Sequence, residues 1–142
     1  MVANPLKHPD LIIKKLCDDE VTFWSGRGNR PIQDVKSRET VLICDPELVQ
    51  TQYLLKACKK KNIQFNRIIH TSSLEMTAAL AYEGGGIVIL PARVANTLYP
   101  NALKRIANTP IYHDELCLVY RGETREIYAI KVIIKAILDY FK

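Results

Sequence analysis

The side chains best suited to nucleophilic or metal chemistry are four cysteines and three histidines. A cysteine and a histidine can act together as nucleophile and base, and the candidate pairs are Cys44 or Cys117 with His70 or His113. The sequence has no nucleophile-elbow motif and no third orienting residue at a recognisable spacing. It also has no Cys-x-x-Cys pair and no histidine placed to complete a zinc site. We therefore predict no catalytic residue, no bound metal and no cofactor.

Small polar side chains stand at two places where an aliphatic run gives way to a helical pattern. They are Cys44, Asp45 and Pro46 in the first turn, and Thr71, Ser72 and Ser73 in the second. Hydroxyl groups and free backbone N–H groups at the start of a helix can hold a carboxylate or a phosphate. The carboxylate of Asp45 repels an anion, so it favours a ligand with a donor or a cationic group.

Four short runs rich in Val, Ile and Leu predict β-strands at Val21–Trp24, Thr40–Cys44, Arg67–Thr71 and Gly86–Leu90. A helix from Pro46 to about Lys61, capped by Asp45, separates the second strand from the third. In the next helix Ser72 and Glu75 match a capping box, and Gly84–Gly86 end it. Alternation of strands and helices predicts an α/β fold whose largely parallel sheet is flanked by helices.

Ligands of such sheets bind beyond the carboxyl ends of the strands. The predicted ligand-facing residues therefore lie in the two polar turns: Asp45, Pro46, Thr71, Ser72 and Ser73, with Cys44 directly before them. Trp24 ends the first strand, before the stretch from Ser25 to Pro31. It either stacks on a ligand or fills the edge of the sheet.

The last third of the chain changes pattern. We expect a short helix at Ala92–Leu98, extended segments around Ile111 and at Cys117–Tyr120, and a terminal helix from about Thr124 to Lys142. The polar residues of that helix form one narrow stripe, and apolar residues occupy nearly every other direction. Such a helix must be covered on more than one side, by its own domain, by a partner chain or by further polypeptide.

The stretch from Ile68 to Pro91 resembles the effector-binding domain of LysR-type transcriptional regulators. In that family a strand, a small polar turn and a helix lead into Gly-x-Gly, an aliphatic run and a proline. Gly84, Gly86, Ile87 and Leu90-Pro91 fit those places, and Leu116–Tyr120 fits a later landmark. The likeness extends less sharply back to Asn4-Pro5, and so covers nearly the whole chain.

The resemblance implies half of a type 2 periplasmic-binding-protein-like fold, which holds a small and often anionic effector between two subdomains. Residues 1–115 would be the second regulatory subdomain, and residues 116–142 would return to a first subdomain missing from this chain. A homo-oligomer is implied, and DNA would be bound only through a missing N-terminal helix-turn-helix domain. The alternatives are a stand-alone small-molecule binding module of the same fold and a cysteine- and histidine-dependent hydrolase or transferase.

Composition adds weaker constraints. Twenty Lys and Arg residues against 15 Asp and Glu residues give a net charge of +5, which permits contact with nucleic acid. The one basic run, Lys59 to Lys61, falls where a helix ends, and there cations complement the helix dipole. The N-terminus lacks the apolar core of a signal peptide, and no apolar stretch is long enough to cross a bilayer. We therefore expect no membrane contact and a cytoplasmic location.

Overall fold

The computed structural model describes residues 1–26 and 40–142. Of the stretch from Ser25 to Pro31 that follows Trp24, residues 27–31 lie outside the described residues. The chain forms two compact units, each of which has its own set of strands and helices. Unit 1 comprises Met1–Asp19 and His113–Lys142, and unit 2 comprises Glu20–Tyr112. The chain passes from one unit to the other within strand β2 (Leu11–Ser25), and returns at the start of strand β7 (Tyr112–Arg121).

Unit 2 is built on a mixed sheet. Its strands are the second part of β2, then β3 (Val41–Cys44), β4 (Arg67–His70), β5 (Ile87–Pro91) and the short β6 (Lys104–Arg105). The order is β2-β5-β3-β4, with β6 on the other side of β2. Pairs β3–β4 and β3–β5 are parallel, whereas β2 pairs antiparallel with both β5 and β6. The α/β class is thus confirmed, but the sheet is mixed rather than largely parallel, because β2 runs against its neighbours.

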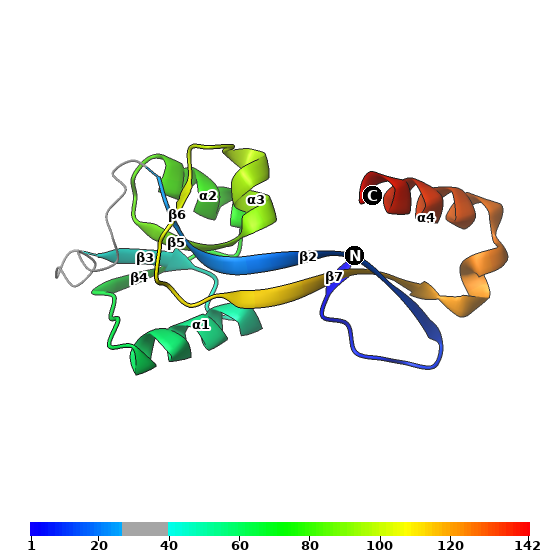
Figure 1. Cartoon of the computed structure of the whole chain (residues 1–142), viewed down its shortest axis with the longest axis horizontal. Helices are drawn as coiled ribbons and strands as arrows, with labels where there is room; N and C mark the ends of the chain where they lie inside the picture. The colour runs from blue at the N-terminus through cyan, green and yellow to red at the C-terminus, as the bar shows by residue number, and fades with distance from the viewer. Residues whose placement is uncertain (27–39) are drawn as a thin grey trace. The chain divides into compact units, whose positions relative to one another are not determined.

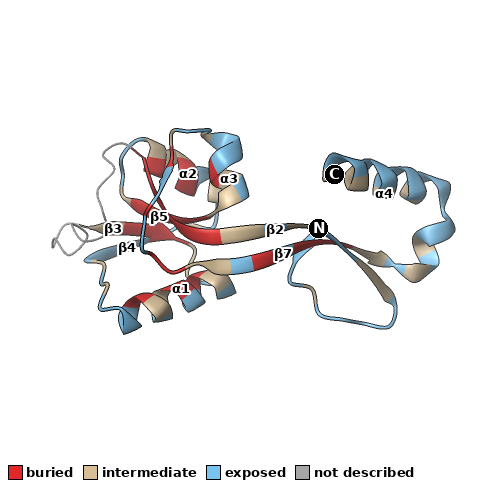
Figure 2. Cartoon of the chain, viewed as in Figure 1, coloured by how far each residue is buried: buried red, intermediate tan, exposed pale blue. Residues whose placement is uncertain are grey.

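Helices cover both faces of this sheet, as predicted. Helix α1 (Val49–Lys60) lies on one face, and α2 (Leu74–Tyr82) and α3 (Ala92–Leu98) lie on the other (Figure 1). Because side chains of a strand alternate between faces, Leu42 and Cys44 join a core cluster with Leu54 of α1. Ile43 joins the second cluster, with Ala78 of α2. The buried residues of unit 2 gather on the strands and on the inner sides of these helices (Figure 2).

The ends of α1 differ in how well the sequence predicts them. The helix begins at Val49 instead of Pro46, and Leu48 is its N-terminal boundary residue. Asp45 therefore does not cap α1. Its carboxylate accepts a hydrogen bond from the backbone N–H of Glu47 at 3.0 Å, which closes a turn before the helix. The other end is close to the expected place, since Asn62 adopts a φ of 55° and its N–H donates to the carbonyl of Lys59.

Unit 1 contains the first part of β2, β1 (Val2–Ala3), most of β7, a 3-10 helix at Gly122–Glu126 and helix α4 (Tyr128–Tyr140). Strand β1 pairs antiparallel with β7, and β7 is also a neighbour of β2. The side chain of Asn4 fastens β1 to β7, since it donates to Asp114 at 2.7 Å and accepts from the N–H of Glu115 at 2.8 Å. Helix α4 has no buried residue, so no side of it is fully covered.

Two kinds of feature, a membrane-spanning helix and a metal-binding cluster, are absent from the described residues. Residues 1–26 and 40–142 contain no helix with the length and apolar character that a membrane crossing requires. The same residues contain no group of three or more His, Cys, Asp or Glu side chains arranged to hold a metal ion.

The junction between α2 and β5 yields a stability prediction. Gly86 has a φ of 151°, and a Cβ there would lie 2.6 Å from the carbonyl oxygen of Val41. Gly84 has a φ of 83° but open space around it. We expect Gly86→Ala to lower the free energy of unfolding by about 2 to 4 kcal/mol, from strain and overpacking together. Gly84→Ala should cost only about 1 kcal/mol. Urea unfolding measures both, and equal losses would contradict the close contact at Gly86.

Candidate functional site

The two polar turns meet at the carboxyl ends of β3 and β4. Cys44 is the register partner of His70, so the strands end level with each other. Directly beyond them, the backbone N–H of Thr71 donates to the carbonyl of Cys44 at 3.1 Å. This hydrogen bond joins the first turn to the second, and brings Asp45 and Pro46 beside Thr71 as parallel strands require. The predicted convergence of the two turns is therefore present.

The first turn, from Asp45 to Glu47, lies at the surface, and hydrogen bonds hold its backbone. Asp45 and Pro46 are half-buried, and Glu47 is exposed. Gln52, one turn into α1, reaches back and donates from Nε2 to the carbonyl of Pro46 at 3.3 Å. The sequence alone does not indicate this contact, because it depends on the helix starting at Val49. A carboxylate and an amide group therefore stand together at this turn.

The second turn is ordered by Thr71 and Ser73. The hydroxyl of Thr71 accepts from the N–H of Ser73 at 3.3 Å, and the hydroxyl of Ser73 accepts from the N–H of Met76 at 3.2 Å. Ser73, not Ser72, is thus the N-cap of α2, which corrects the predicted capping box by one residue. Glu75 still takes part, since it accepts a hydrogen bond from the Ser73 hydroxyl at 3.1 Å. Ser72 is exposed, and its side chain is not used for the cap.

The combined surface is rich in oxygen acceptors. Carboxylates are supplied by Asp45, Glu47 and Glu75, and hydroxyls by Thr71 and Ser72. The start of α2 adds backbone N–H donors. Negative charge at the turns favours a ligand that brings hydrogen-bond donors or positive charge, whereas the helix start favours an anionic group. The surface is therefore suited to a small polar molecule that carries both kinds of group.

Two residues predicted for this site lie elsewhere in the packing. Cys44 is fully buried on the α1 side of the sheet. Trp24 is 5% exposed, belongs to the cluster on the α2 and α3 side, and donates from its indole N–H to the carbonyl of Leu90 at 3.0 Å. Of the two roles considered for Trp24, filling the sheet is the one that this contact supports. The Cys44 side chain belongs to the core and not to the surface of the turns.

Cys44 and His70 do not have the geometry of a nucleophile and its base. Cys44 and His70 are register partners, yet no hydrogen bond joins them in the described part of the chain. Burial, and secondarily the charge of Asp45, raise the pKa of the Cys44 thiol to about 11. Burial, and then the nearby Glu115, also raise the pKa of Cys117. A raised pKa holds both groups as unreactive thiols near neutral pH.

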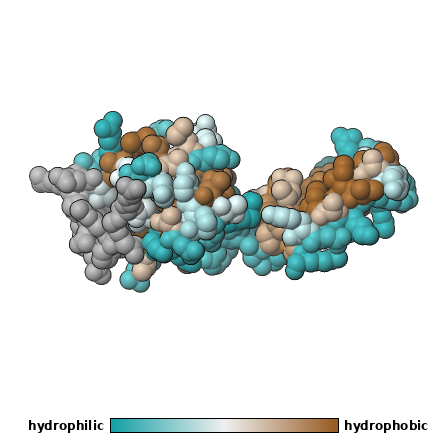
Figure 3. All heavy atoms as spheres, turned by 90° about the horizontal axis from the view of Figure 1, so that it is seen from above, coloured by the Kyte–Doolittle hydropathy of each residue, from teal (hydrophilic) through white to brown (hydrophobic). Residues whose placement is uncertain are grey.

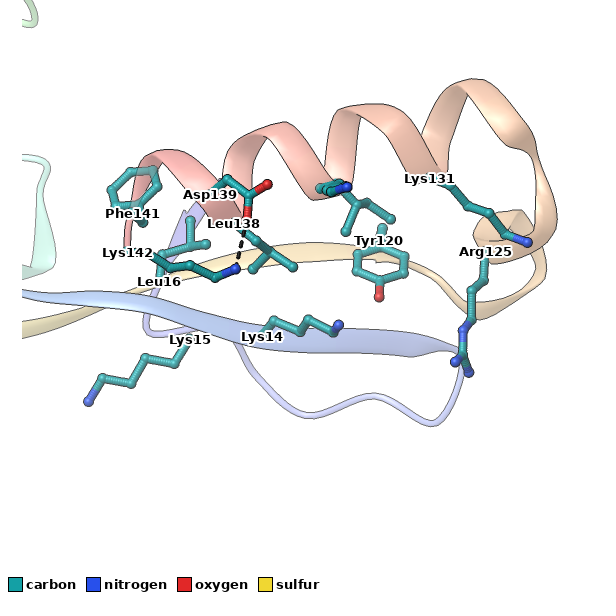
Figure 4. Close-up of a pocket in the computed structure, with 12 residues that line it drawn as sticks. Lys14, Lys15, Leu16, Tyr120, Arg125, Lys131, Leu138, Asp139, Phe141 and Lys142 are labelled. Carbon is teal, nitrogen blue, oxygen red and sulfur yellow. Dashed lines mark hydrogen bonds and ion pairs between the residues drawn. The ribbon is translucent and has the colours of Figure 1, made fainter.

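A groove of about 490 Å³ lies in unit 1, between α4 and the strands β2 and β7 (Figure 4). It contains none of the predicted site residues. Apolar side chains line it from both sides, with Leu16 and Tyr120 on the strands and Leu138 on α4, and several lysines also line it. Lys15 pairs with Asp18 and Glu115, Lys131 with Glu126, and Lys142 with Asp139. No ion pair of Lys14, Arg125 or Lys135 is found among the described residues.

These ion pairs lower the pKa values of Glu126 and Asp139, each mainly through a hydrogen bond from its lysine. All are exposed to solvent, so they contribute little to stability. Three of the six cations that line the groove are thus paired, and Lys14, Arg125 and Lys135 leave it positively charged.

The whole chain matches a known protein family. The family described as "LysR substrate binding domain" matches residues 1–142. No curated protein matches the sequence.

Solved structures share the fold. The chain is similar to CbnR, a LysR family transcriptional regulator, at 18% identity and a TM-score of 0.58, over 96% of this chain and 50% of CbnR. It is similar to the regulatory domain of CcmR from Synechocystis PCC6803 in complex with 2-PG, at 14% identity and 0.67, over 99% and 72%. It is also similar to the regulatory domain of CrgA from Neisseria meningitidis, at 15% and 0.71, over 99% and 73%. The chain thus spans half the length of CbnR.

The capping of α2 can be tested with two adjacent serines. Ser73→Ala removes the acceptor for the N–H of Met76, and we expect a loss of about 1 kcal/mol in the free energy of unfolding. Ser72→Ala should change that free energy by less than about 0.5 kcal/mol, as for an exposed side chain outside the cap. Chemical unfolding of the two variants decides between them. A larger loss for Ser72→Ala would restore the capping box predicted from the sequence.

Thiol labelling tests the burial of the cysteines. Cys17 is partly exposed, whereas Cys44, Cys58 and Cys117 are buried, and burial raises the pKa of Cys58 to about 11 as well. At pH 8 a thiol with that pKa is almost entirely protonated, and it ionises only as the pH rises towards 11. We expect one fast-reacting cysteine per native chain, and its loss in Cys17→Ser. A second fast-reacting group that survives this substitution would revive the nucleophile interpretation.

Proposed function

Because the chain belongs to the family of LysR substrate binding domains, we propose that it is the effector-sensing part of a DNA-binding transcriptional regulator. The observation that carries this proposal is the family match over residues 1–142. The fold agrees, since solved regulators and regulatory domains of the family cover 96% or more of the chain. CbnR has also been solved with its target DNA, and CcmR with 2-PG, so both halves of the proposed function occur among structures of this fold.

We assign residues 1–115 to the second regulatory subdomain, and residues 116–142 to a segment that returns to a first subdomain. The compact unit at Glu20–Tyr112 falls within the first of these parts, whereas Met1–Asp19, also within it, forms the other compact unit together with His113–Lys142. The chain covers only 72% and 73% of the regulatory domains of CcmR and CrgA, so those domains are longer than this chain. The uncovered helix α4 supports the same assignment, since a first subdomain would bury its apolar surface.

In this proposal the effector binds at the turns after β3 and β4, with Asp45, Pro46, Thr71, Ser72 and Ser73 as one wall of the site. Binding between two subdomains favours one relative arrangement of them over another. In an oligomeric regulator that change repositions the DNA-binding domains, which couples effector concentration to transcription. The proposal places the protein in the cytoplasm, where its DNA target is.

The proposal assigns no catalytic step to the chain. The family is one of substrate binding domains, and no hydrogen bond joins the Cys44 thiol to the His70 imidazole within the described residues. The raised thiol pKa values of Cys44 and Cys117 weigh against a thiolate nucleophile. A hydrolase or transferase is therefore the less favoured alternative.

We propose that the 142-residue chain forms homo-oligomers through α4. Tyr128, Val132, Ile133 and Tyr140 are between 50% and 84% exposed. The hydrophobic surface of unit 1 is broad on the side of α4, at the right of the space-filling view (Figure 3). Burying each such side chain gains roughly 1.5 to 3 kcal/mol, which a second copy can supply when no first subdomain is present.

Calorimetry tests the effector site. We expect 2-PG, citrate or a small diamine to bind the chain only weakly, with a Kd in the millimolar range, because a single wall buries little of a ligand. Thr71→Ala should weaken that binding about tenfold. Lys14→Gln, in the groove of unit 1, is the matched control and should leave it unchanged. Tight binding by the chain alone would show that it holds a complete site, and weakening by Lys14→Gln alone would place the ligand in the groove.

Sedimentation tests the role of α4. Ile133→Lys and Tyr140→Lys place charge on the exposed apolar side of the helix, so the double variant should be monomeric at a concentration where the parent associates. Lys135→Gln, on the polar stripe, serves as control and should associate like the parent. Circular dichroism checks the helix in all three. A parent that stays monomeric at high micromolar concentration would contradict the proposed oligomer.

A further inference from the structure

The net charge of the chain is confined to one segment. From Leu48 to Leu74 the sequence contains no Asp or Glu, but it contains five basic residues: Lys56, Lys59, Lys60, Lys61 and Arg67. The whole chain has 20 Lys and Arg against 15 Asp and Glu. Outside the segment, the number of basic residues therefore equals the number of acidic residues, 15 of each. The net charge of +5 is accounted for by α1, β4 and their connection.

These five side chains, here called the cationic edge, are all exposed. In the described part of the chain none of them forms an ion pair, as is also true of Lys14, Arg125 and Lys135 in unit 1. By contrast, Lys15, Arg105, Lys131 and Lys142 each pair with a carboxylate. The edge lies entirely within unit 2, at the C-terminal end of α1 and the start of β4. It is therefore a source of uncompensated positive charge at the end of the sheet opposite the turns after β3 and β4.

Helix stabilisation does not account for the whole edge. Cations in the last turn of α1 complement its dipole, which explains Lys59 and Lys60. Lys56 is one turn earlier and repels Lys60 at a spacing of four residues, which destabilises a helix by a few tenths of a kcal/mol. Arg67 lies beyond the helix, on β4. At least two of the five charges therefore bring no benefit to α1.

The edge is also separate from the exposed apolar side chains of α1. Val49 and Tyr53 belong to the first half of α1, directly after Leu48, and the three helical lysines belong to its second half. Lys56 and Lys60 are about 6 Å apart along the helix axis, at 1.5 Å per residue. That spacing is close to the rise over two phosphates of one DNA strand, at roughly 3.4 Å each. Long cationic side chains on an exposed surface are typical of phosphate contacts.

We propose that the cationic edge binds the phosphate backbone of duplex DNA, without reading its sequence. The inference rests on the proposed function, which keeps the domain near DNA, and it adds a second contact to the helix-turn-helix domain expected from the family resemblance. Phosphate contacts of this kind release counterions, so their strength falls steeply with salt. The contact would help to hold a sensing domain against flanking DNA.

Fluorescence anisotropy with a labelled 20-base-pair duplex tests the edge directly in the 142-residue chain. We expect binding at about 50 mM salt, with a slope of log K against log salt of about −3 to −4, as for roughly four phosphate contacts. The triple variant Lys56→Gln, Lys59→Gln and Lys60→Gln should bind at least tenfold more weakly, and its slope should be flatter by about 2 to 3. Glutamine preserves helix propensity.

The matched control is Lys14→Gln, Arg125→Gln and Lys135→Gln, which removes the same charge from unit 1. It should retain the slope of the parent. Equal weakening by the two triple variants, or no binding by the parent at low salt, would overturn the inference. A third result would also overturn it: the parent self-associates without binding DNA, and the triple variant at Lys56, Lys59 and Lys60 abolishes that association. The cationic edge would then contact a second chain, beside the exposed Ile68 and Ile69 of β4. Each of these results leaves the calorimetric test of the effector site unaffected.

Discussion

The structure of unit 2 depends on one short strand, β3, which is paired in parallel on both sides and covered by helices on both faces. Leu42, Ile43 and Cys44 are at most 1% exposed, so each must pack against one of the two core clusters. A slip of one residue would exchange the two faces. The register is therefore firmly set, and with it the level at which β3 and β4 end.

That level also sets the geometry of the candidate site. Because β3 and β4 end together, the Thr71 N–H reaches the Cys44 carbonyl, and the starts of α1 and α2 are held within one surface. The same parallel arrangement places the end of α1 and the start of β4 at the opposite edge of the sheet. The carboxyl ends of β3 and β4 thus carry hydrogen-bond acceptors and helix starts, and the opposite end of the sheet carries lysines. The two edges differ in chemistry because crossover connections separate helix starts from helix ends.

The sequence predicted the parts of this arrangement that follow from local patterns. The aliphatic runs located β3, β4 and β5 to within one or two residues, and α3 was predicted at its observed bounds. Long-range pairing was less accessible. The first ten residues of β2 were missed because Lys14, Lys15 and Asp18 interrupt its apolar pattern, and its antiparallel direction depends on how β5 accepts it.

The site shows the same division. Apposition of the turns follows from the α/β pattern, but the choice between Ser72 and Ser73 as cap depends on backbone geometry that a motif does not specify. Trp24 was left with two roles because its partner, the carbonyl of Leu90, is 66 residues away in the sequence. Local chemistry indicates which residue types can bind a ligand, and tertiary contacts decide which of them are free to do so.

The most direct test of the proposed effector site at the turns after β3 and β4 is amide hydrogen exchange at Thr71, read by NMR with and without the ligand that calorimetry identifies. A ligand bound across both turns must keep the Thr71 to Cys44 hydrogen bond closed. At ten times its Kd, such a ligand should slow the exchange of the Thr71 amide about tenfold. The Gly122 amide, bonded to Asp10 in unit 1, should be unaffected. Slowing at Gly122 with no change at Thr71 would contradict the assignment of the sensing surface to these turns.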